Sequence, residues 1–282
     1  MTPTTATTSA TTSATAPVPP AADHYDGFLA EHYTWMLGGD LGALADAQRA
    51  HLSDWGVVPV VPGPAPAAGS LAVDLGCGPG HTSLALAESG FDLVLAVDLS
   101  QSLLDELSAH AAEIPAPAVR PVRSDLRTAL RDLVRPGSAD AVVCLGDTLT
   151  HLPTRGDVAA LLNDIAGALA PDGTAVLSYR DLTVPLTGTD RFLPVRSAED
   201  RIMTCFLEYP DDYDDYTVVV HDLIHTRSAP EGAWTLHARS YRKLRLAHAW
   251  VLEQCRTAGL RVVREETGAG GGMRTVVLRR AV

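Results

Sequence analysis

Five short apolar runs alternate with segments of helical length between Leu71 and Tyr179, and this alternation restricts the fold of the chain more than any other feature. The runs are LAVDL, LVLAVD, AVRPV, DAVVCL and GTAVLSY, and turn residues bound each of them. Strands that are apolar along most of their length are buried on both faces. The pattern therefore predicts an α/β fold in which a doubly wound parallel sheet is covered by helices on both sides.

The chain before this region divides into two parts. Residues 1–22 are rich in Thr, Ala and Pro and cannot supply a core, so we expect a disordered tail. Residues 23–69 begin with a polar-aromatic helical stretch and end in VVPVVPGPAPAAG, whose Pro and Gly content marks a linker. We expect an N-terminal helical lid and linker here, ahead of a core over residues 70–182.

The pattern changes after Tyr179. RIMTCFLEY, YTVVVHDLIHTR and WTLHARSYRKLRL are typical of three successive antiparallel strands, which predicts an antiparallel β insertion over residues 183–246. A helix over about 247–258 follows, and then the runs RVVREET and MRTVVLRR. We expect this last pair to form a hairpin at the edge of the main sheet, so that residues 247–282 return to the core.

Composition excludes several classes of partner. The net charge is −12 and Lys and Arg are scattered, so the chain lacks the basic block that nucleic-acid binding requires. No apolar run approaches the roughly 18 residues of a membrane span. The four cysteines are far apart without CxxC spacing, which predicts reduced thiols and no metal site. We therefore expect a cytoplasmic protein with a small-molecule partner and with no nucleic-acid or membrane partner. A homo-oligomer is compatible with this composition.

The turn after the first apolar run, VDLGCGPG, is the strongest candidate for a binding site. Glycines at a strand-to-helix turn expose backbone N–H groups at the positive end of the helix dipole, where a polar ligand binds. Dinucleotide-binding proteins use a similar turn with GxGxxG spacing, whereas the spacing here is GxGxG. Asp98 ends the second run, where a carboxylate can accept both hydroxyls of a ribose. Asp125 follows the third run, next to Leu126.

VDLGCGPG, AVDLS and SDL together resemble the class I S-adenosylmethionine-dependent methyltransferases over roughly Leu71 to Tyr179. The resemblance implies a Rossmann-like sheet in which the glycine loop approaches the methionine part of the cofactor. It also implies that Asp98 holds the ribose and that Asp125 and Leu126 hold the adenine. We expect the cofactor-binding residues of this core to be Asp74, Gly76, Cys77, Gly78, Asp98, Leu99, Asp125, Leu126 and Leu145.

Two further segments resemble the glycine and glycine/sarcosine N-methyltransferases. These are CLGDTLTHLP after the fourth run and SYRDL after the fifth, although the Asn that usually follows the Arg is missing. The resemblance implies that Arg180 binds the carboxylate of the substrate, as a planar guanidinium can. An ion pair of Arg180 with Asp181 or Asp147 is the structural alternative. We expect Asp147, Arg180 and Tyr241 to contact the substrate.

The lid carries an aromatic cluster. Aromatic faces attract a sulfonium, so Tyr33 and Trp35 are expected at the cofactor, with Arg49 near its carboxylate. We expect Tyr25, His151 and Arg180 to be the catalytic residues. The alternatives are a helix that buries its aromatic side chains on the core, and a His151 that caps the next helix.

The resemblance implies transfer of a methyl group from S-adenosylmethionine to a small molecule, and the finer features favour the nitrogen of an amino acid or amine. The alternatives are O- or C-methylation in a natural-product pathway, and a cofactor-binding regulatory subunit that is not an enzyme. Fold alone does not distinguish between these acceptors.

Overall fold

The computed structural model describes residues 24–60, 69–112, 119–210, 216–268 and 272–281. The expected tail over residues 1–22 and most of the expected linker lie outside these residues. Within them, no helix is both long enough and apolar enough to cross a membrane.

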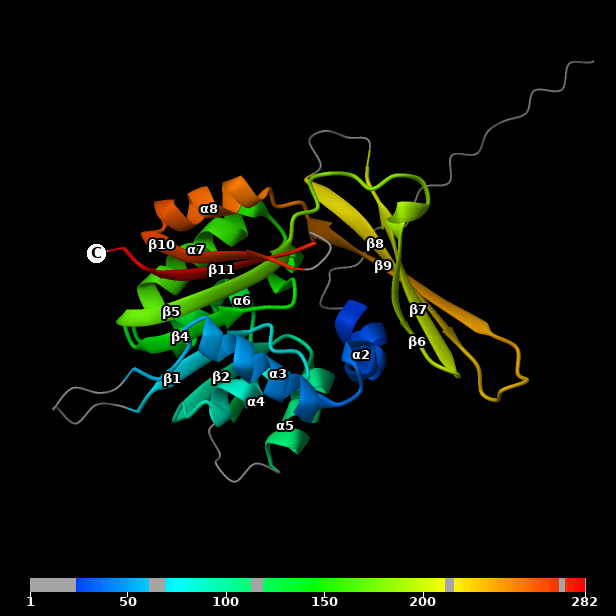
Figure 1. The fold of residues 1–282 in the computed structure, drawn as a ribbon, viewed down its shortest axis with the longest axis horizontal. Coiled ribbons are helices and arrows are strands. Elements are labelled where there is room, and N and C mark those ends of the chain that lie inside the picture. The colour runs from blue at the N-terminus through cyan, green and yellow to red at the C-terminus, as the bar shows by residue number, and fades with distance from the viewer. Residues whose placement is uncertain (1–23, 61–68, 113–118, 211–215, 269–271, 282) are drawn as a thin grey trace, which may run out of the picture.

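The larger of two sheets has seven strands in the order β10-β11-β5-β4-β1-β2-β3 (Figure 1). Strands β1 to β5 are mutually parallel, and β11 is antiparallel to both β5 and β10. This order confirms the doubly wound sheet and the closing hairpin at its edge. The strands are β1 (Leu71–Leu75), β2 (Leu93–Asp98), β3 (Val119–Arg123), β4 (Ala139–Cys144), β5 (Leu169–Arg180), β10 (Leu260–Thr267) and β11 (Met273–Arg280).

Helices cover both faces of this sheet, as Figure 1 shows. On one face lie α3 (Leu41–Asp54), α4 (His81–Glu88) and α5 (Gln101–Ala111), and on the other lie α6 (Leu126–Leu133), α7 (Arg155–Ala168) and α8 (His248–Thr257). Helix α5 illustrates how the sequence determines these elements. The Ser100 hydroxyl accepts a hydrogen bond from the Leu103 N–H and caps the helix, and the side chains of Leu103, Leu104 and Leu107 are buried.

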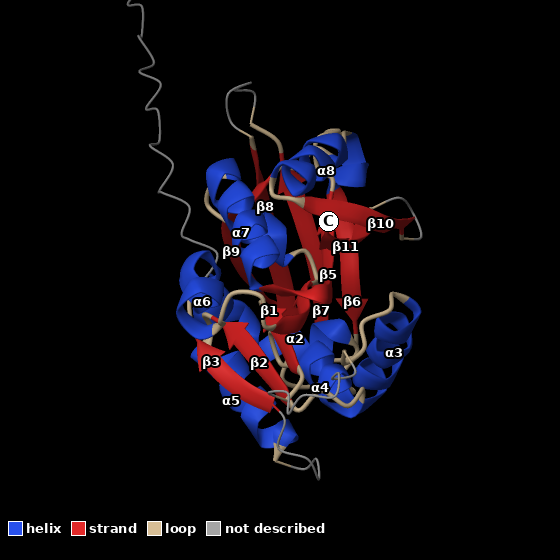
Figure 2. Ribbon diagram, turned by 90° about the vertical axis from the view of Figure 1, so that its left-hand side faces the viewer, coloured by secondary structure: helices blue, strands red, loops and turns tan. Residues whose placement is uncertain are grey.

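The second sheet has four antiparallel strands in the order β6-β7-β8-β9; it lies beside the large sheet in Figure 1 and behind it in Figure 2. The strands are β6 (Phe192–Ser197), β7 (Arg201–Glu208), β8 (Thr217–Thr226) and β9 (Thr235–Leu244). The three predicted strands are β7, β8 and β9, and the fourth strand, β6, was not predicted. Pro194 and a register shift between Pro194 and Arg196 interrupt its pattern, and an edge strand tolerates both.

The N-terminal segment packs against this second sheet (Figure 1). It consists of a π-helix, η1 (Tyr25–Leu29), followed by α2 (Ala30–Leu37). Leu29 forms a buried cluster with Met203 of β7 and Ile224 of β8. Two short 3-10 helices, η2 (Thr148–His151) after β4 and η3 (Gly188–Arg191) before β6, complete the described elements.

Candidate active site

A cavity of about 510 Å³ opens where the carboxyl ends of β1 to β4 meet the N-terminal segment and the second sheet. The strand order reverses between β1 and β4, and ligands of open α/β sheets bind outside such a reversal. Nine of the expected site residues line the cavity: Tyr25, Tyr33, Gly76, Gly78, Asp98, Leu99, Asp125, Leu126 and His151. The sequence analysis missed other lining residues, among them Ser100, Arg127, Thr148, Thr217, Lys243 and Leu244.

The three glycines of the loop after β1 have different roles. A Cβ on Gly76 would lie 2.3 Å from Cγ2 of Thr148, and a Cβ on Gly80 would lie 2.1 Å from Cδ1 of Leu107. Both glycines also have positive φ, so packing and backbone geometry exclude a side chain there. Gly78 lines the cavity, as Gly76 does, and has φ of 55°; the absence of a side chain at Gly78 leaves room for a ligand.

Asp98 is held in place at the cavity wall by backbone donors. Its Oδ2 accepts the Gly78 N–H at 2.9 Å, and its Oδ1 accepts the Ser100 N–H at 2.9 Å. Burial raises the pKa of Asp98, and these N–H groups oppose that shift. Each carboxylate oxygen keeps a further lone pair, so Asp98 can still accept hydroxyl donors from the cavity.

Asp125 and Leu126 lie at the start of α6. Asp125 is the N-cap of this helix and accepts the Arg127 N–H at 2.9 Å. The Arg127 guanidinium also pairs with it at 2.6 Å, and these hydrogen bonds lower the pKa of Asp125. The carboxylate is therefore ionised beside the apolar wall that Leu126 supplies.

Three expected cofactor residues lie behind the cavity wall and not on it. Asp74 is buried and accepts the Ser83 hydroxyl at 2.6 Å, and burial raises its pKa to about 7. Cys77 is buried within the glycine loop, and Leu145 packs against the core cluster under α4. These three residues thus pack behind the glycine loop and do not contact the cavity.

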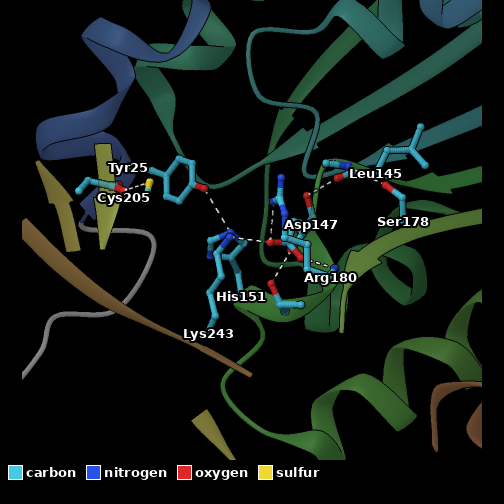
Figure 3. Close-up of polar contacts among 12 residues, drawn as sticks. Tyr25, Leu145, Asp147, His151, Ser178, Arg180, Cys205 and Lys243 are labelled. Atoms are coloured by element: carbon cyan, nitrogen blue, oxygen red, sulfur yellow. Dashed lines mark hydrogen bonds and ion pairs between the residues drawn. The ribbon is translucent and has the colours of Figure 1, made fainter. Parts of the chain in front are cut away.

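The other end of the cavity is aromatic. The Tyr25 hydroxyl lies 3.2 Å from Nε2 of His151 (Figure 3), and the Tyr25 ring is 5.6 Å from that of Tyr33. Tyr241 stacks on His151 with ring centroids 5.4 Å apart and does not line the cavity. Burial lowers the pKa of His151 to about 3, so the ring is neutral at physiological pH. Its Nδ1 is buried and has no hydrogen-bond partner within the described chain.

Asp147 joins the two sheets next to this aromatic end. Its Oδ2 pairs with Lys243 Nζ of β9 at 2.7 Å and with Arg180 Nη1 at 3.3 Å, and its Oδ1 accepts the Arg180 N–H at 2.8 Å (Figure 3). Burial alone raises the pKa of Asp147, but the attraction of Lys243 and Arg180 outweighs burial and lowers it. Arg180 and Asp147 do not line the cavity, whereas Lys243 does. For Arg180, the geometry thus favours the structural ion pair with Asp147 over a contact with the carboxylate of a substrate.

The structure places two expected cofactor residues away from the cavity. The ring of Trp35 lies against Arg201 of the second sheet, 5.3 Å from the guanidinium carbon. Arg49 is half-exposed on α3 and pairs with Asp46 at 2.8 Å and with Glu88 at 3.8 Å. Trp35 packs against the apolar cluster at the second sheet, whereas Tyr25 and Tyr33 of the same segment line the cavity.

The central part of the chain is similar to known methyltransferases. Residues 72–173 match the model of a family described as a methyltransferase domain. The cypemycin N-terminal methyltransferase of a Streptomyces species is 34% identical over 169 residues, which cover 54% of this chain and 65% of that protein. The glycine/sarcosine N-methyltransferase of Halorhodospira halochloris is 34% identical over 109 residues, 39% of each chain. The matches thus span less than two thirds of these relatives. Other relatives of similar identity are named as O-methyltransferases.

The likeness in fold extends over nearly the whole chain. The CcbJ methyltransferase from Streptomyces caelestis superimposes with a TM-score of 0.72 at 20% identity, covering 93% of this chain and 99% of that one. At this identity the match concerns the fold alone.

Proposed function

We propose that the protein is a class I S-adenosylmethionine-dependent methyltransferase that transfers a methyl group to the nitrogen of a small amine or amino acid, a proposal that the match of residues 72–173 to a methyltransferase domain and the shared fold support. One relative is named a cypemycin N-terminal methyltransferase and another a glycine/sarcosine N-methyltransferase. Their names support a nitrogen acceptor for this chain.

The residues of the cavity fit the cofactor. Gly78 leaves space that a Cβ would reduce. Asp98 presents a half-buried carboxylate with spare lone pairs for ribose hydroxyls, and Leu126 offers an apolar wall for an adenine. When bound, S-adenosylmethionine supplies an electrophilic methyl group on a sulfonium, and its neutral thioether leaves without needing an acid. The remaining work of the chain is to orient the acceptor and to exclude water.

The aromatic end of the cavity suits an uncharged amine. An attacking nitrogen needs its lone pair, and His151 is neutral, so its ring adds no charge beside the reacting atoms. In the tautomer in which the His151 Nε2–H donates to the Tyr25 hydroxyl oxygen, Nδ1 is an acceptor without a partner in the described chain, and we assign it to an N–H of the amine. An unpaired buried acceptor is costly, and a substrate N–H would satisfy it.

One observation carries this proposal: the neutral, incompletely hydrogen-bonded His151 shares a single cavity with Asp98. The test is incubation with S-adenosylmethionine and a panel of amines, amino acids and phenols. We expect S-adenosylhomocysteine to form and an amine to gain the mass of one methylene. Methylation of phenols alone would establish the O-methyltransferase alternative. Cofactor binding without turnover on any class would favour the regulatory subunit.

A further inference from the structure

Lys243 is the only lysine in the chain. The chain has 22 Lys and Arg residues in total, and all of them except Lys243 are arginines. The chain therefore uses a compact ammonium at one position only, and that position is at the wall of the cavity. Lysine and arginine differ in function, since an ammonium is a small point charge with three donors on a flexible stem.

The surroundings of Lys243 leave part of this ammonium available. Only 11% of the side chain is exposed, and Nζ donates to Asp147 Oδ2 at 2.7 Å. No second hydrogen-bond partner of Nζ occurs within the described ranges. Figure 3 shows the side chain beside Asp147 and His151, at the aromatic end where the acceptor is expected.

The charges around Lys243 do not balance. Asp147 is one carboxylate between two cations, Lys243 and Arg180. His151 is neutral. The buried carboxylate of Asp222 accepts hydrogen bonds from His24 at 2.8 Å and from the Cys205 thiol at 2.9 Å, and Asp98 lies on the cavity wall with its own backbone donors. The group of Asp147, Arg180 and Lys243 thus carries an excess positive charge, and Lys243 is its member on the cavity wall.

We propose that Lys243 binds an anionic group of the acceptor, a carboxylate or a phosphate ester, while Asp147 orients its ammonium. The inference rests on the proposed amine methylation and narrows its substrate class to amines that carry an anionic group. It assigns to Lys243 the anion-binding role that the sequence suggested for Arg180. A buried charge that contacts an anion by a charge-assisted hydrogen bond gains both affinity and orientation.

A single lysine allows a direct binding experiment. Protein labelled with ¹³C at lysine Cε gives one lysine signal, which reports only on Lys243. The protein is saturated with S-adenosylhomocysteine and titrated with glycine against glycinamide, and with O-phosphoethanolamine against ethanolamine. We expect a saturable shift of the signal with at least one anionic compound and none with its uncharged partner. Saturation by glycine alone identifies a carboxylate, and saturation by the phosphate compound alone identifies a phosphate ester.

Equal responses to the charged and uncharged members of both pairs, or no response to any, would overturn the proposal. Lys243→Met provides a second readout: we expect KM for an anionic acceptor to rise at least about tenfold, with cofactor affinity unchanged. Intact amine methylation without anion binding would refute only the role of Lys243. Anion binding without any amine methylation would refute only the proposed acceptor.

Discussion

At the scale of single residues, Asp98 links the glycine loop to the cavity. Asp98→Ala removes the acceptor proposed for two ribose hydroxyls, each charge-assisted bond being worth about 1.5–3 kcal/mol. We expect cofactor affinity, measured by calorimetric titration, to fall at least about tenfold. Asp98→Asn keeps one acceptor oxygen for Gly78 or Ser100 and is expected to lose less. Unchanged affinity in the alanine variant would remove Asp98 from the cofactor site.

Asp74 makes stability depend on pH in a direction that can be worked out. Burial raises its pKa from 3.8 to about 7 in the folded protein. Between about pH 4 and pH 7 the unfolded chain has lost this proton while the folded chain keeps it, so wild-type stability falls as pH rises. Above pH 7 both states are ionised and the loss is complete.

Asp74→Asn removes this ionisation and keeps an acceptor for the Ser83 hydroxyl. We therefore expect the Tm of the variant, relative to wild type, to increase from pH 4 to pH 7 and to stay constant above. Differential scanning calorimetry at four pH values measures the difference. A relative Tm that is flat across this window, or that falls, contradicts the buried ionisable Asp74.

The low pKa of His151 leads to an expectation for how the methylation rate depends on pH. With a pKa of about 3 it stays neutral throughout the accessible range, so it contributes no titration to the rate. We expect kcat/KM to rise with the deprotonation of the acceptor itself. Two acceptor amines of different pKa should then give different midpoints. A common midpoint between pH 5 and 8 that disappears in His151→Asn would instead show a titrating histidine base.

The residue scale also shows how far the sequence allowed the site to be predicted. Motif positions at strand ends were predictable, because the order of strands brings Gly78, Asp98 and Asp125 to one edge of the sheet. The contact between Asp147 and Lys243 spans 96 positions and two sheets, which no local pattern encodes. Its one trace in the sequence is that Lys243 is the sole lysine.

At the scale of elements, the N-terminal segment closes the cavity because it contacts residues of the second sheet and residues that follow strands of the large sheet. His24 pairs with Asp222 of β8 at 2.8 Å with both side chains buried, and the Asp26 carboxylate accepts the Ser100 hydroxyl at 2.9 Å at the start of α5. Tyr25 reaches His151. These contacts place the aromatic wall, so the segment has the position of a lid.

Deletion of residues 1–37 is expected to abolish turnover, because it removes Tyr25 and Tyr33 from the cavity. The large sheet forms its cores without this segment, so far-UV circular dichroism should retain most of its signal. Deletion of residues 1–22 is the matched control and should leave turnover unchanged. Normal turnover in the longer deletion, or its loss in the shorter one, would contradict the lid.

Elements whose patterns were regular were predictable, and the exceptions have physical causes. Strands β1, β2 and β11 begin and end at the expected residues, because turn residues bound their apolar runs. Strand β6 lies at an edge and holds a proline, so its pattern is weak. Asp147 has φ of 77° without being glycine, a conformation held by Lys243 and Arg180 from distant elements.

At the scale of the whole molecule, the two sheets depend on one another. The inner face of the second sheet buries Val218, Val220 and Tyr241 against Leu182, which follows the last residue of β5 by two positions. Arg155 of α7 lies 3.8 Å from the ring of Tyr216, next to β8. A four-stranded sheet that lacks these partners would expose its apolar face, so it is not expected to be stable alone.

The cofactor should therefore stabilise both sheets together, and two tryptophans can report on them separately. Trp234 precedes β9, and Trp250 belongs to α8 beside the core. We expect two single-tryptophan variants, which keep either Trp234 or Trp250 and replace the other three of the four tryptophans, to unfold in urea at the same midpoint. Saturating S-adenosylhomocysteine should then raise both midpoints equally, because a ligand stabilises everything that unfolds with its site. A Trp234 transition at lower urea, unmoved by the ligand, would instead establish the second sheet as a separate folding unit, and the cavity would then lie between two independent domains.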